Sequence, residues 1–265
     1  MAFPLGPFLL QKPLARGGTA EVWRAVHESE GHPVAVKVMM TELARDPAFR
    51  TAFRTEVRAV AALGHPNVVP IYDFGEIPAS TEEAVGGRLA AGSPYLVMEL
   101  APLGSLSRRR GKLGWGSLRR SLVGILRALA HAHANGMLHC DLKPGNLLVH
   151  PGDQVRLGDF GLARARNPHD DGPVAGGTPT YMAPEQFTQH WRAFGPWTDL
   201  YGLGCVAWVL ACGTPPFGDG STAEETRDRH LAGAIAPFTP STPVPDGFEA
   251  WIHRAIAVDP ADRFQ

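Results

Sequence analysis

The feature that most constrains the fold is a change of pattern near Ala101, from strand-like segments before it to helix-like segments after it. Residues 22–26 and 34–39 are strand-like and flank a short turn, which predicts a β-hairpin. Between residues 118 and 132, apolar side chains recur at helical spacing, and Asn135-Gly136 then supplies a typical helix end. No Gly/Ser-rich linker separates the two halves. We therefore expect an α+β protein in two lobes, residues 1–100 and 101–265.

The first half carries further regular patterns. Residues 68–74 and 95–100 read as two more strands, and the Ala/Gly-rich stretch 76–93 between them has no clear periodicity, which predicts a loop insertion. Residues 47–63 predict one helix, stopped by Gly64-His65-Pro66. Its apolar stripe consists of Phe49, Phe53, Val57 and Val60.

The second half combines helices with one small hairpin. Residues 147–149 and 155–157 flank a Pro-Gly-Asp turn and predict that hairpin. The most apolar stretch, residues 200–212, is too short to span a membrane and predicts a buried helix. Residues 167–184 show no periodic pattern, and a long segment of that kind in a compact domain is either functional or evidence against the assignment of elements.

The composition excludes several classes of protein. The chain has 265 residues with 25 basic and 26 acidic side chains, and a net charge of −1 gives no support for nucleic acid as a partner. Its three cysteines are too few for a disulfide framework and wrongly spaced for a zinc ribbon, so we expect a reducing compartment. The N-terminus lacks the regions of a signal peptide, and no stretch reaches about 18 apolar residues. We therefore expect a cytoplasmic location.

The loop His139-Cys140-Asp141-Leu142-Lys143-Pro144-Gly145-Asn146 concentrates the groups that phosphoryl transfer needs. A carboxylate can accept a hydroxyl proton, an ammonium group can neutralise a moving phosphoryl group, and an amide oxygen can bind Mg²⁺. A second carboxylate follows at Asp159, in the triplet Asp159-Phe160-Gly161 directly after the predicted hairpin. Either segment alone would be read as a turn with solvated charges. Together, in this order and spacing, they indicate a phosphotransferase.

Two charges in the first half also call for a partner. Glu56 lies seven residues after Phe49 and four before Val60, so it shares the face of the apolar stripe. A core-facing carboxylate left unpaired would cost several kcal/mol. Lys37, between Val36 and Val38 in a predicted strand, needs a partner for the same reason. The alternative is two unrelated solvated charges.

These segments together resemble the catalytic domain of eukaryotic-like Ser/Thr protein kinases, over essentially the whole chain. The octapeptide at 139–146, Asp-Phe-Gly at 159–161 and Ala-Pro-Glu at 183–185 look like the catalytic loop, the metal loop and the end of the activation segment. Val-Ala-Val-Lys at 34–37 resembles the strand that carries the ATP-phosphate lysine. Lys143 and Gly-Thr-Pro at 177–179 resemble the Ser/Thr rather than the Tyr branch.

The resemblance implies a small antiparallel sheet lobe with one helix, a larger helical lobe, and ATP-Mg²⁺ between them, with Mn²⁺ as an alternative metal. Lys37 would orient the α- and β-phosphates and pair with Glu56. The metal would be held by Asn146 and Asp159. Asp141 would accept the hydroxyl proton, and Lys143 would steady the γ-phosphate.

The resemblance also places the nucleotide pocket. In the glycine-rich stretch 15–22, only Gly17 and Val22 match the family pattern, with Gly18 adding backbone freedom, and Ala15 and Ala20 at the outer positions predict weaker ATP affinity. The adenine edge would meet the backbone of Glu99 and Ala101, and Met98 would line the back of the pocket. The remaining residues that the resemblance assigns to the pocket are Leu14, Ala35 and Leu148.

Other positions carry supporting roles in such a family. Asp199 would begin a buried helix that anchors the catalytic loop, and Arg263 would pair with Glu185. Cys140 stands where most members have an Arg that receives an activation-segment phosphate, so we expect such a phosphate to matter less here. Hydrogen bonding of His139 within the catalytic loop is expected rather than base catalysis.

Two alternatives to a protein kinase stay open. The altered glycine-rich stretch motivates a pseudokinase scaffold that binds nucleotide or partners without transfer, and a small-molecule phosphotransferase could share the Asp…Asn…Asp set. The likeness to bacterial members implies protein substrates with Ser or Thr acceptors, and the cytoplasmic part of a longer membrane-anchored protein as an alternative location. The end of the chain, two residues after Arg263, predicts a domain truncated before the end of its last helix.

Weaker signals come from two further groups of residues: the run Arg108-Arg109-Arg110, and the pair His131 and His133. The arginines are expected to form a solvated face, because charge runs usually do. The histidines lie two residues apart on a predicted helix, so they point differently and are not expected to form a metal pair. Thr178 is expected to bond Asp141 and Lys143.

Overall fold

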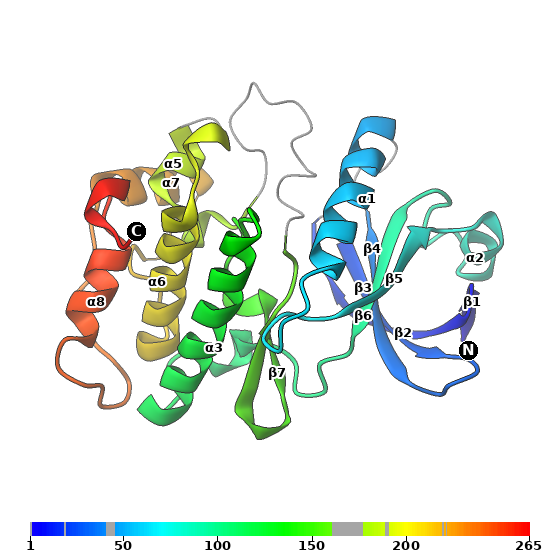
Figure 1. Cartoon of the computed structure of the whole chain (residues 1–265), viewed down its shortest axis with the longest axis horizontal. Helices are drawn as coiled ribbons and strands as arrows, with labels where there is room; N and C mark the ends of the chain where they lie inside the picture. The colour runs from blue at the N-terminus through cyan, green and yellow to red at the C-terminus, as the bar shows by residue number, and fades with distance from the viewer. Residues whose placement is uncertain are drawn as a thin grey trace. The chain divides into compact units, whose positions relative to one another are not determined.

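The computed structural model describes residues 2–18, 20–40, 46–160, 177–188, 191–218, 220 and 222–265. The chain divides into two compact units. The first contains residues up to Gly64 and Val69–Ala101, and the second contains His65–Val68 and most of the chain after Pro102. Figure 1 shows that the first unit is built on a curled sheet and the second mainly on helices.

A six-stranded antiparallel sheet forms the first unit, in the order β1-β2-β3-β4-β6-β5. The hairpin predicted from residues 22–39 is confirmed as β3 and β4, and the two later strands are confirmed as β5 and β6. Two N-terminal strands, β1 and β2, join the sheet without having been marked out by the sequence pattern. The strands are β1 Phe3–Leu5, β2 Phe8–Arg16, β3 Ala20–His27, β4 Pro33–Met39, β5 Ile71–Glu76 and β6 Pro94–Glu99.

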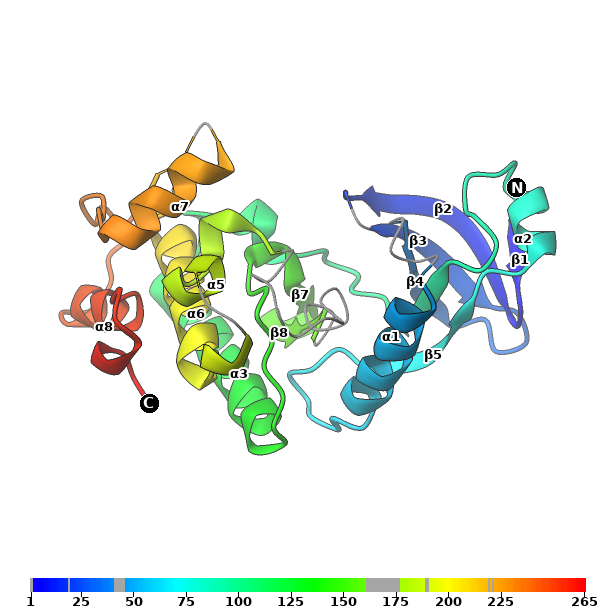
Figure 2. The same ribbon diagram turned by 90° about the horizontal axis from the view of Figure 1, so that it is seen from above.

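Helix α1, Pro47–Ala61, packs against β5 and β6 (Figure 2). Its start is fixed locally, because the Asp46 side chain accepts a hydrogen bond from the Ala48 amide at 2.8 Å and Pro47 occupies the first turn. The buried face is the predicted stripe of Phe49, Phe53, Val57 and Val60.

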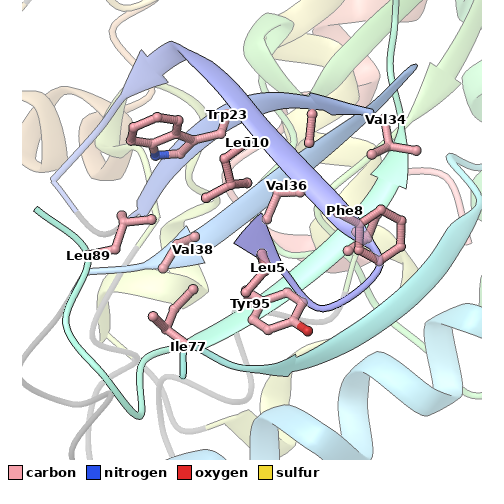
Figure 3. Packing of buried hydrophobic residues seen from close by; sticks show 12 residues of the cluster. Leu5, Phe8, Leu10, Trp23, Val34, Val36, Val38, Ile77, Leu89 and Tyr95 are labelled. Atoms are coloured by element: carbon pink, nitrogen blue, oxygen red, sulfur yellow. The ribbon is translucent and has the colours of Figure 1, made fainter. Parts of the chain in front are cut away.

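The prediction of a plain loop at 76–93 is wrong. The segment contains helix α2, Ala79–Ala84, and its Thr81 hydroxyl donates to the carbonyl oxygen of Pro4 in β1 at 2.6 Å. Ile77 and Leu89 belong to the core cluster that covers one face of the sheet (Figure 3). We call residues 77–93 the strap, because Ile77 at its start and Leu89 near its end are both packed into this core.

The second unit is built around helix α6, Pro196–Cys212, which lies between α3 and α8 (Figure 1). This confirms the buried helix expected at residues 200–212. Two glycines let its neighbours approach closely: a Cβ at Gly204 would lie 2.5 Å from Ile256, and one at Gly202 would lie 3.1 Å from Leu142 of the catalytic loop. The other elements are α3 Trp115–Ala134, β7 Leu147–His150, β8 Gln154–Leu157, α5 Pro184–Thr188, α7 Ala223–Ala232 and α8 Phe248–Ala255.

The hairpin of β7 and β8 and the stripe of α3 are both as predicted. Short 3₁₀ turns occur at Leu106–Arg109, Pro144–Asn146, Pro151–Asp153, Pro179–Tyr181, Trp191–Ala193 and Pro260–Asp262. Most of the patternless stretch 167–184 lies outside the described residues. Over the part of the chain that the structure describes, no helix combines the length and apolar character needed to cross a bilayer.

Candidate active site

The catalytic loop, residues 139–146, runs between α3 and β7 in the second unit, and its charged side chains bond one another directly. Lys143 Nζ donates to Asp141 Oδ2 at 2.7 Å and to Thr178 Oγ1 at 3.0 Å. Thr178 Oγ1 in turn lies 3.4 Å from Asp141 Oδ1. Both oxygens of the largely buried Asp141 carboxylate are therefore held, and the role expected for Thr178 is confirmed.

Asn146 and Asp159, the two expected metal ligands, are linked through the backbone. The Asn146 side-chain Nδ2 donates to the Asp141 carbonyl oxygen at 2.8 Å, so its Oδ1 is the atom available to a cation. The Gly158 amide donates to the Asn146 carbonyl oxygen at 2.8 Å, directly before Asp159. An amide and a carboxylate oxygen fit Mg²⁺, which typically takes few protein ligands when a nucleotide supplies phosphate oxygens.

Asp159 follows β8 with a positive φ of 61°, a region that costs energy for any residue with a Cβ. Such conformations concentrate at functional sites because the surrounding structure must enforce them. The adjacent Phe160 is buried and packs its ring edge-on against His139, with 4.8 Å between ring centroids. Gly161, the third residue of this motif, lies outside the described residues.

His139 is fully buried and bonds the loop on both sides of its ring. Its Nε2 lies 2.9 Å from the Gly158 carbonyl oxygen, and the Asp141 amide donates to its Nδ1 at 3.2 Å. Because a carbonyl only accepts and an amide N–H only donates, Nε2 is the donor of the ring and Nδ1 is the acceptor. The expectation that His139 positions the loop is confirmed.

Asp199, in the first turn of α6, anchors this loop from the core. Its fully buried carboxylate accepts the His139 amide at 2.9 Å and the Cys140 amide at 2.7 Å, as expected for the residue that holds the catalytic loop. A third donor, His133 Nε2 of α3 at 2.8 Å, was not expected from the sequence. That contact is visible only after α3 and α6 are packed together.

Arg263 and Glu185 form the predicted ion pair. Arg263 Nη1 and Nη2 donate to the two Glu185 oxygens at 2.8 and 2.9 Å, and both side chains are almost fully buried. Arg263 also donates to the carbonyl oxygens of Ala257 and Val258. The charge-assisted, two-point contact ties α5 to the end of the described chain.

Gln186 is a functional candidate that sequence reasoning missed. Its buried amide accepts from the Ala183 N–H at 2.9 Å and donates to the Cys140 carbonyl oxygen at 2.9 Å. It therefore joins the Ala-Pro-Glu segment to the residue that precedes Asp141. Cys140 has a positive φ of 58° and packs against Phe194, in apolar surroundings unlike those of a phosphate-binding arginine. A single glutamine leaves no spacing pattern, so no signal in the sequence marks it.

The arginine run at 108–110 is largely on the surface, as expected, with Arg108 and Arg110 exposed and Arg109 half-buried. Arg109 donates to Asp153 at 3.0 Å, and this guanidinium holds the pKa of the Asp153 carboxyl below its usual value. Arg110 donates to the Tyr181 hydroxyl at 3.0 Å. Two of the three arginines thus have structural partners within the second unit.

The expected phosphate-binding residues lie in the first unit. Lys37 is 6% exposed on β4, and Glu56 is half-buried on α1; their pairing stays a prediction. Val22 on β3 pairs with Lys37 in the sheet register. Gly17 and Gly18 are in the turn before β3, where the Gly17 amide donates to the Ala20 carbonyl oxygen at 2.9 Å.

The other predicted pocket residues are spread over both units. Ala35 of β4 pairs with Met98 of β6, Glu99 ends β6, and Ala101 follows it. Leu14 is 45% exposed on β2. Leu148 is half-buried on β7 in the second unit. Their assignment to a nucleotide pocket stays a prediction.

Known proteins similar to this chain agree with these features. The family model described as "Protein kinase domain" matches residues 8–265. The Serine/threonine-protein kinase PknA of Mycobacterium tuberculosis (strain ATCC 25618 / H37Rv) is 37% identical over 266 residues, which is 98% of this chain and 58% of PknA. The Probable serine/threonine-protein kinase PknB of Bifidobacterium longum (strain NCC 2705) is 34% identical, covering 98% of this chain and 38% of that protein.

A third relative, the Serine/threonine-protein kinase PknH of Mycobacterium bovis (strain ATCC BAA-935 / AF2122/97), is 35% identical over 98% of this chain and 42% of PknH. The chain thus spans little more than half the length of PknA and less of the other two. The family match covers nearly all of the chain, and the Asp141, Asn146 and Asp159 motifs lie within it. The chain therefore belongs to the protein kinase domain family, as a bacterial-type Ser/Thr kinase catalytic domain.

Proposed function

We propose that this domain transfers the γ-phosphate of ATP to Ser or Thr hydroxyls of proteins, its own chain included. The observation that carries the proposal is the bonded set of Asp141, Lys143 and Thr178, which places a carboxylate and an ammonium group together beside a threonine hydroxyl. Relatives that are named Ser/Thr-protein kinases over nearly this whole chain support it. Free thiols at all three cysteines support a cytoplasmic location.

In this proposal, each group of the catalytic loop has a separate task. The Asp141 carboxylate orients the substrate hydroxyl and accepts its proton, while Lys143 stabilises the negative charge of the transferred phosphoryl group. Asn146 and Asp159 would hold Mg²⁺ or Mn²⁺. A bound metal ion of this kind neutralises phosphate charge. Holding the reacting groups in place supplies most of such catalysis.

ATP recognition falls to residues of the first unit. Lys37, paired with Glu56, would orient the α- and β-phosphates, and the turn at Gly17 and Gly18 would cover them. The Glu99 amide donates to the Pro70 carbonyl oxygen at 3.1 Å, so the backbone contact of Glu99 with adenine would come from its carbonyl oxygen. Ala101 would offer its N–H.

The experiment measures transfer of labelled γ-phosphate from ATP-Mg²⁺ to the chain itself and to a generic basic protein. We expect Asp141→Asn to lower the rate by at least about a hundredfold, because it removes the proton acceptor. The exposed Asp228 supplies the matched control, and Asp228→Asn should transfer at the wild-type rate. Label on Ser and Thr alone is expected.

A pseudokinase scaffold is the alternative that the altered glycine-rich turn motivates. It would bind ATP in a calorimetric titration yet show no transfer in either the wild type or Asp141→Asn. A peptide-versus-metabolite acceptor screen separates the protein kinase from a small-molecule phosphotransferase. Label appearing only on small molecules would contradict the proposed substrate class.

A further inference from the structure

A fully buried carboxylate lies at the start of β3, directly after the glycine-rich turn. Glu21 is 0% exposed, although it sits at the end of a strand next to a turn open to solvent at Gly17 and Gly18. Burying a carboxylate is costly unless charged or hydrogen-bonding groups compensate for the lost water. Something in the first unit must therefore supply that compensation.

The partner of Glu21 is Arg88 of the strap. Arg88 Nε lies 3.1 and 3.3 Å from the two Glu21 oxygens, and Arg88 Nη2 also donates to Oε1. The same guanidinium lies over the Trp23 ring, 5.1 Å from its centroid. The Arg88 side chain thus binds two residues of β3, one through a forked ion pair and the other through a cation–π contact.

The strap holds Arg88 in place from both ends. The Ile77 amide donates to Ser93 at 2.9 Å, and the Gly92 amide donates back to Ile77 at 2.8 Å, which closes the base of the segment. The next residue after Arg88, Leu89, is fully buried in the core cluster beside Val38 (Figure 3). Arg88 therefore projects from a fixed point, even though 41% of its side chain is exposed.

The contact acts on the strand that leads out of the nucleotide-binding turn. Because side chains alternate along a strand, Glu21 and Trp23 share one face and Val22 points to the other. Val22 is paired with Lys37 in the sheet, and Glu21 is paired with Val38. The contact of Arg88 with Glu21 therefore holds β3 one residue away from the position that pairs with Lys37, the proposed phosphate-binding lysine.

We propose that Arg88 is a positioning residue for ATP. By binding Glu21 and Trp23, it fixes the start of β3 and so the position at which the turn at Gly17 and Gly18 joins this strand. The inference rests on the proposed function of that turn. The proposal also assigns a function to the strap. The outer positions of the turn are Ala15 and Ala20, so the glycine pattern of the family is incomplete there. Order supplied from outside the turn would offset that loss.

The test compares Arg88→Ala with the wild type in ATP titrations and in steady-state transfer. Without the guanidinium, Glu21 must regain water, and the end of β3 shifts to expose it. We expect KM and Kd for ATP to rise about tenfold, equivalent to roughly 1.4 kcal/mol, while kcat stays near the wild-type value. Arg88→Lys keeps the charge but not the fork, so it should recover part of the affinity.

Thr81→Val is the matched control, because it removes another strap contact, the 2.6 Å bond to Pro4, without touching β3. It should lower the melting temperature and leave the KM for ATP unchanged. An equal rise of KM in Thr81→Val, or wild-type ATP affinity in a folded Arg88→Ala, would overturn the inference. If Arg88→Ala does not fold, the test rests on Arg88→Lys. A wild-type Kd for ATP in that variant would contradict the inference.

The two proposals fail in different ways. Wild-type protein that binds ATP but transfers no phosphate would contradict the proposed activity and still allow Arg88 to be tested by its Kd. Wild-type transfer with unaltered ATP affinity in the Arg88 variants would leave the activity intact and remove the inference.

Discussion

Asp141 is preceded by a backbone that residues outside the catalytic loop hold in place, and Gln186 is one of them, beside Asp199. Gln186→Leu removes both amide bonds and leaves the Cys140 carbonyl and the Ala183 N–H buried without these partners. We expect kcat to fall about tenfold, since a lost buried hydrogen bond of this kind corresponds to roughly 1–3 kcal/mol. Steady-state kinetics should show an unchanged KM for ATP.

The exposed Gln154 at the start of β8 offers a control of the same type. Gln154→Leu should leave kcat at the wild-type value. Unchanged kcat in a folded Gln186→Leu would show that the amide bridge contributes to packing alone.

At the scale of residues, the sequence was sufficient to predict a side-chain contact wherever suitable residue types occur together in a specific motif. Asp141, Lys143 and the Arg263–Glu185 pair lie in motifs whose order is specific, and Thr178 follows from the same match. Gln186 and His133 were missed because their partners are brought to them by the packing of distant segments. The pairing of Lys37 with Glu56 remains a prediction.

Among the structural elements, the Arg263–Glu185 pair links α5 to the turn Pro260–Asp262 and buries both charges. Arg263→Met leaves Glu185 charged and buried, so we expect a loss of about 3–5 kcal/mol in the free energy of unfolding. Urea denaturation measures it. The exposed Arg227→Met should change stability little.

The double variant Glu185→Leu with Arg263→Met separates charge from packing. Replacing both partners of a buried pair by apolar residues is often neutral, so most of the stability should return. A double variant as unstable as Arg263→Met would show that Arg263 acts mainly through its bonds to the carbonyl oxygens of Ala257 and Val258.

Elements with a clear period were predictable, and the strap was not. The stripe of α1 and the β3–β4 hairpin are local patterns that the sequence carries in full. Helix α2 has only six residues, too few to be stable alone, and its segment is held by Ile77 and Leu89 in the sheet core. Such tertiary packing has no local signature.

For the molecule as a whole, the two-lobed α+β fold class was predictable, because strand-like and helix-like patterns occupy different halves of the chain. The membership of His65–Val68 in the second unit was not predictable. Asn67 of this segment donates to the Val155 carbonyl oxygen at 2.9 Å, a contact across 88 positions of sequence. Because periodicity in a sequence reports only local structure, it cannot reveal a contact between residues so far apart in the chain.

The stability of the whole fold should depend on pH through His230. This side chain is fully buried beside Tyr201 and Phe217, and burial lowers its pKa from 6.5 to about 4. The unfolded chain therefore binds a proton between these values while the folded chain does not, so stability falls as the pH drops through this window. Relative to His230→Gln, the wild type should lose about 2 kcal/mol more between pH 7.5 and pH 5.

Denaturation in urea at both pH values measures this difference. Other titratable groups are present in both proteins and cancel, such as His65, whose pKa is also lowered by burial. Equal pH dependence of the wild type and His230→Gln would contradict the assignment.

The bonds of Asp199 restrict how this domain can be regulated. Two amides of the catalytic loop and the His133 ring converge on one carboxylate of the innermost helix. A shift of the loop would break these bonds and leave a fully buried carboxylate without its amide donors, which is costly. A regulator that leaves these three bonds intact must therefore act elsewhere than on the backbone of residues 139–140, for example on the residues proposed to hold the nucleotide or the metal, or on the acceptor peptide.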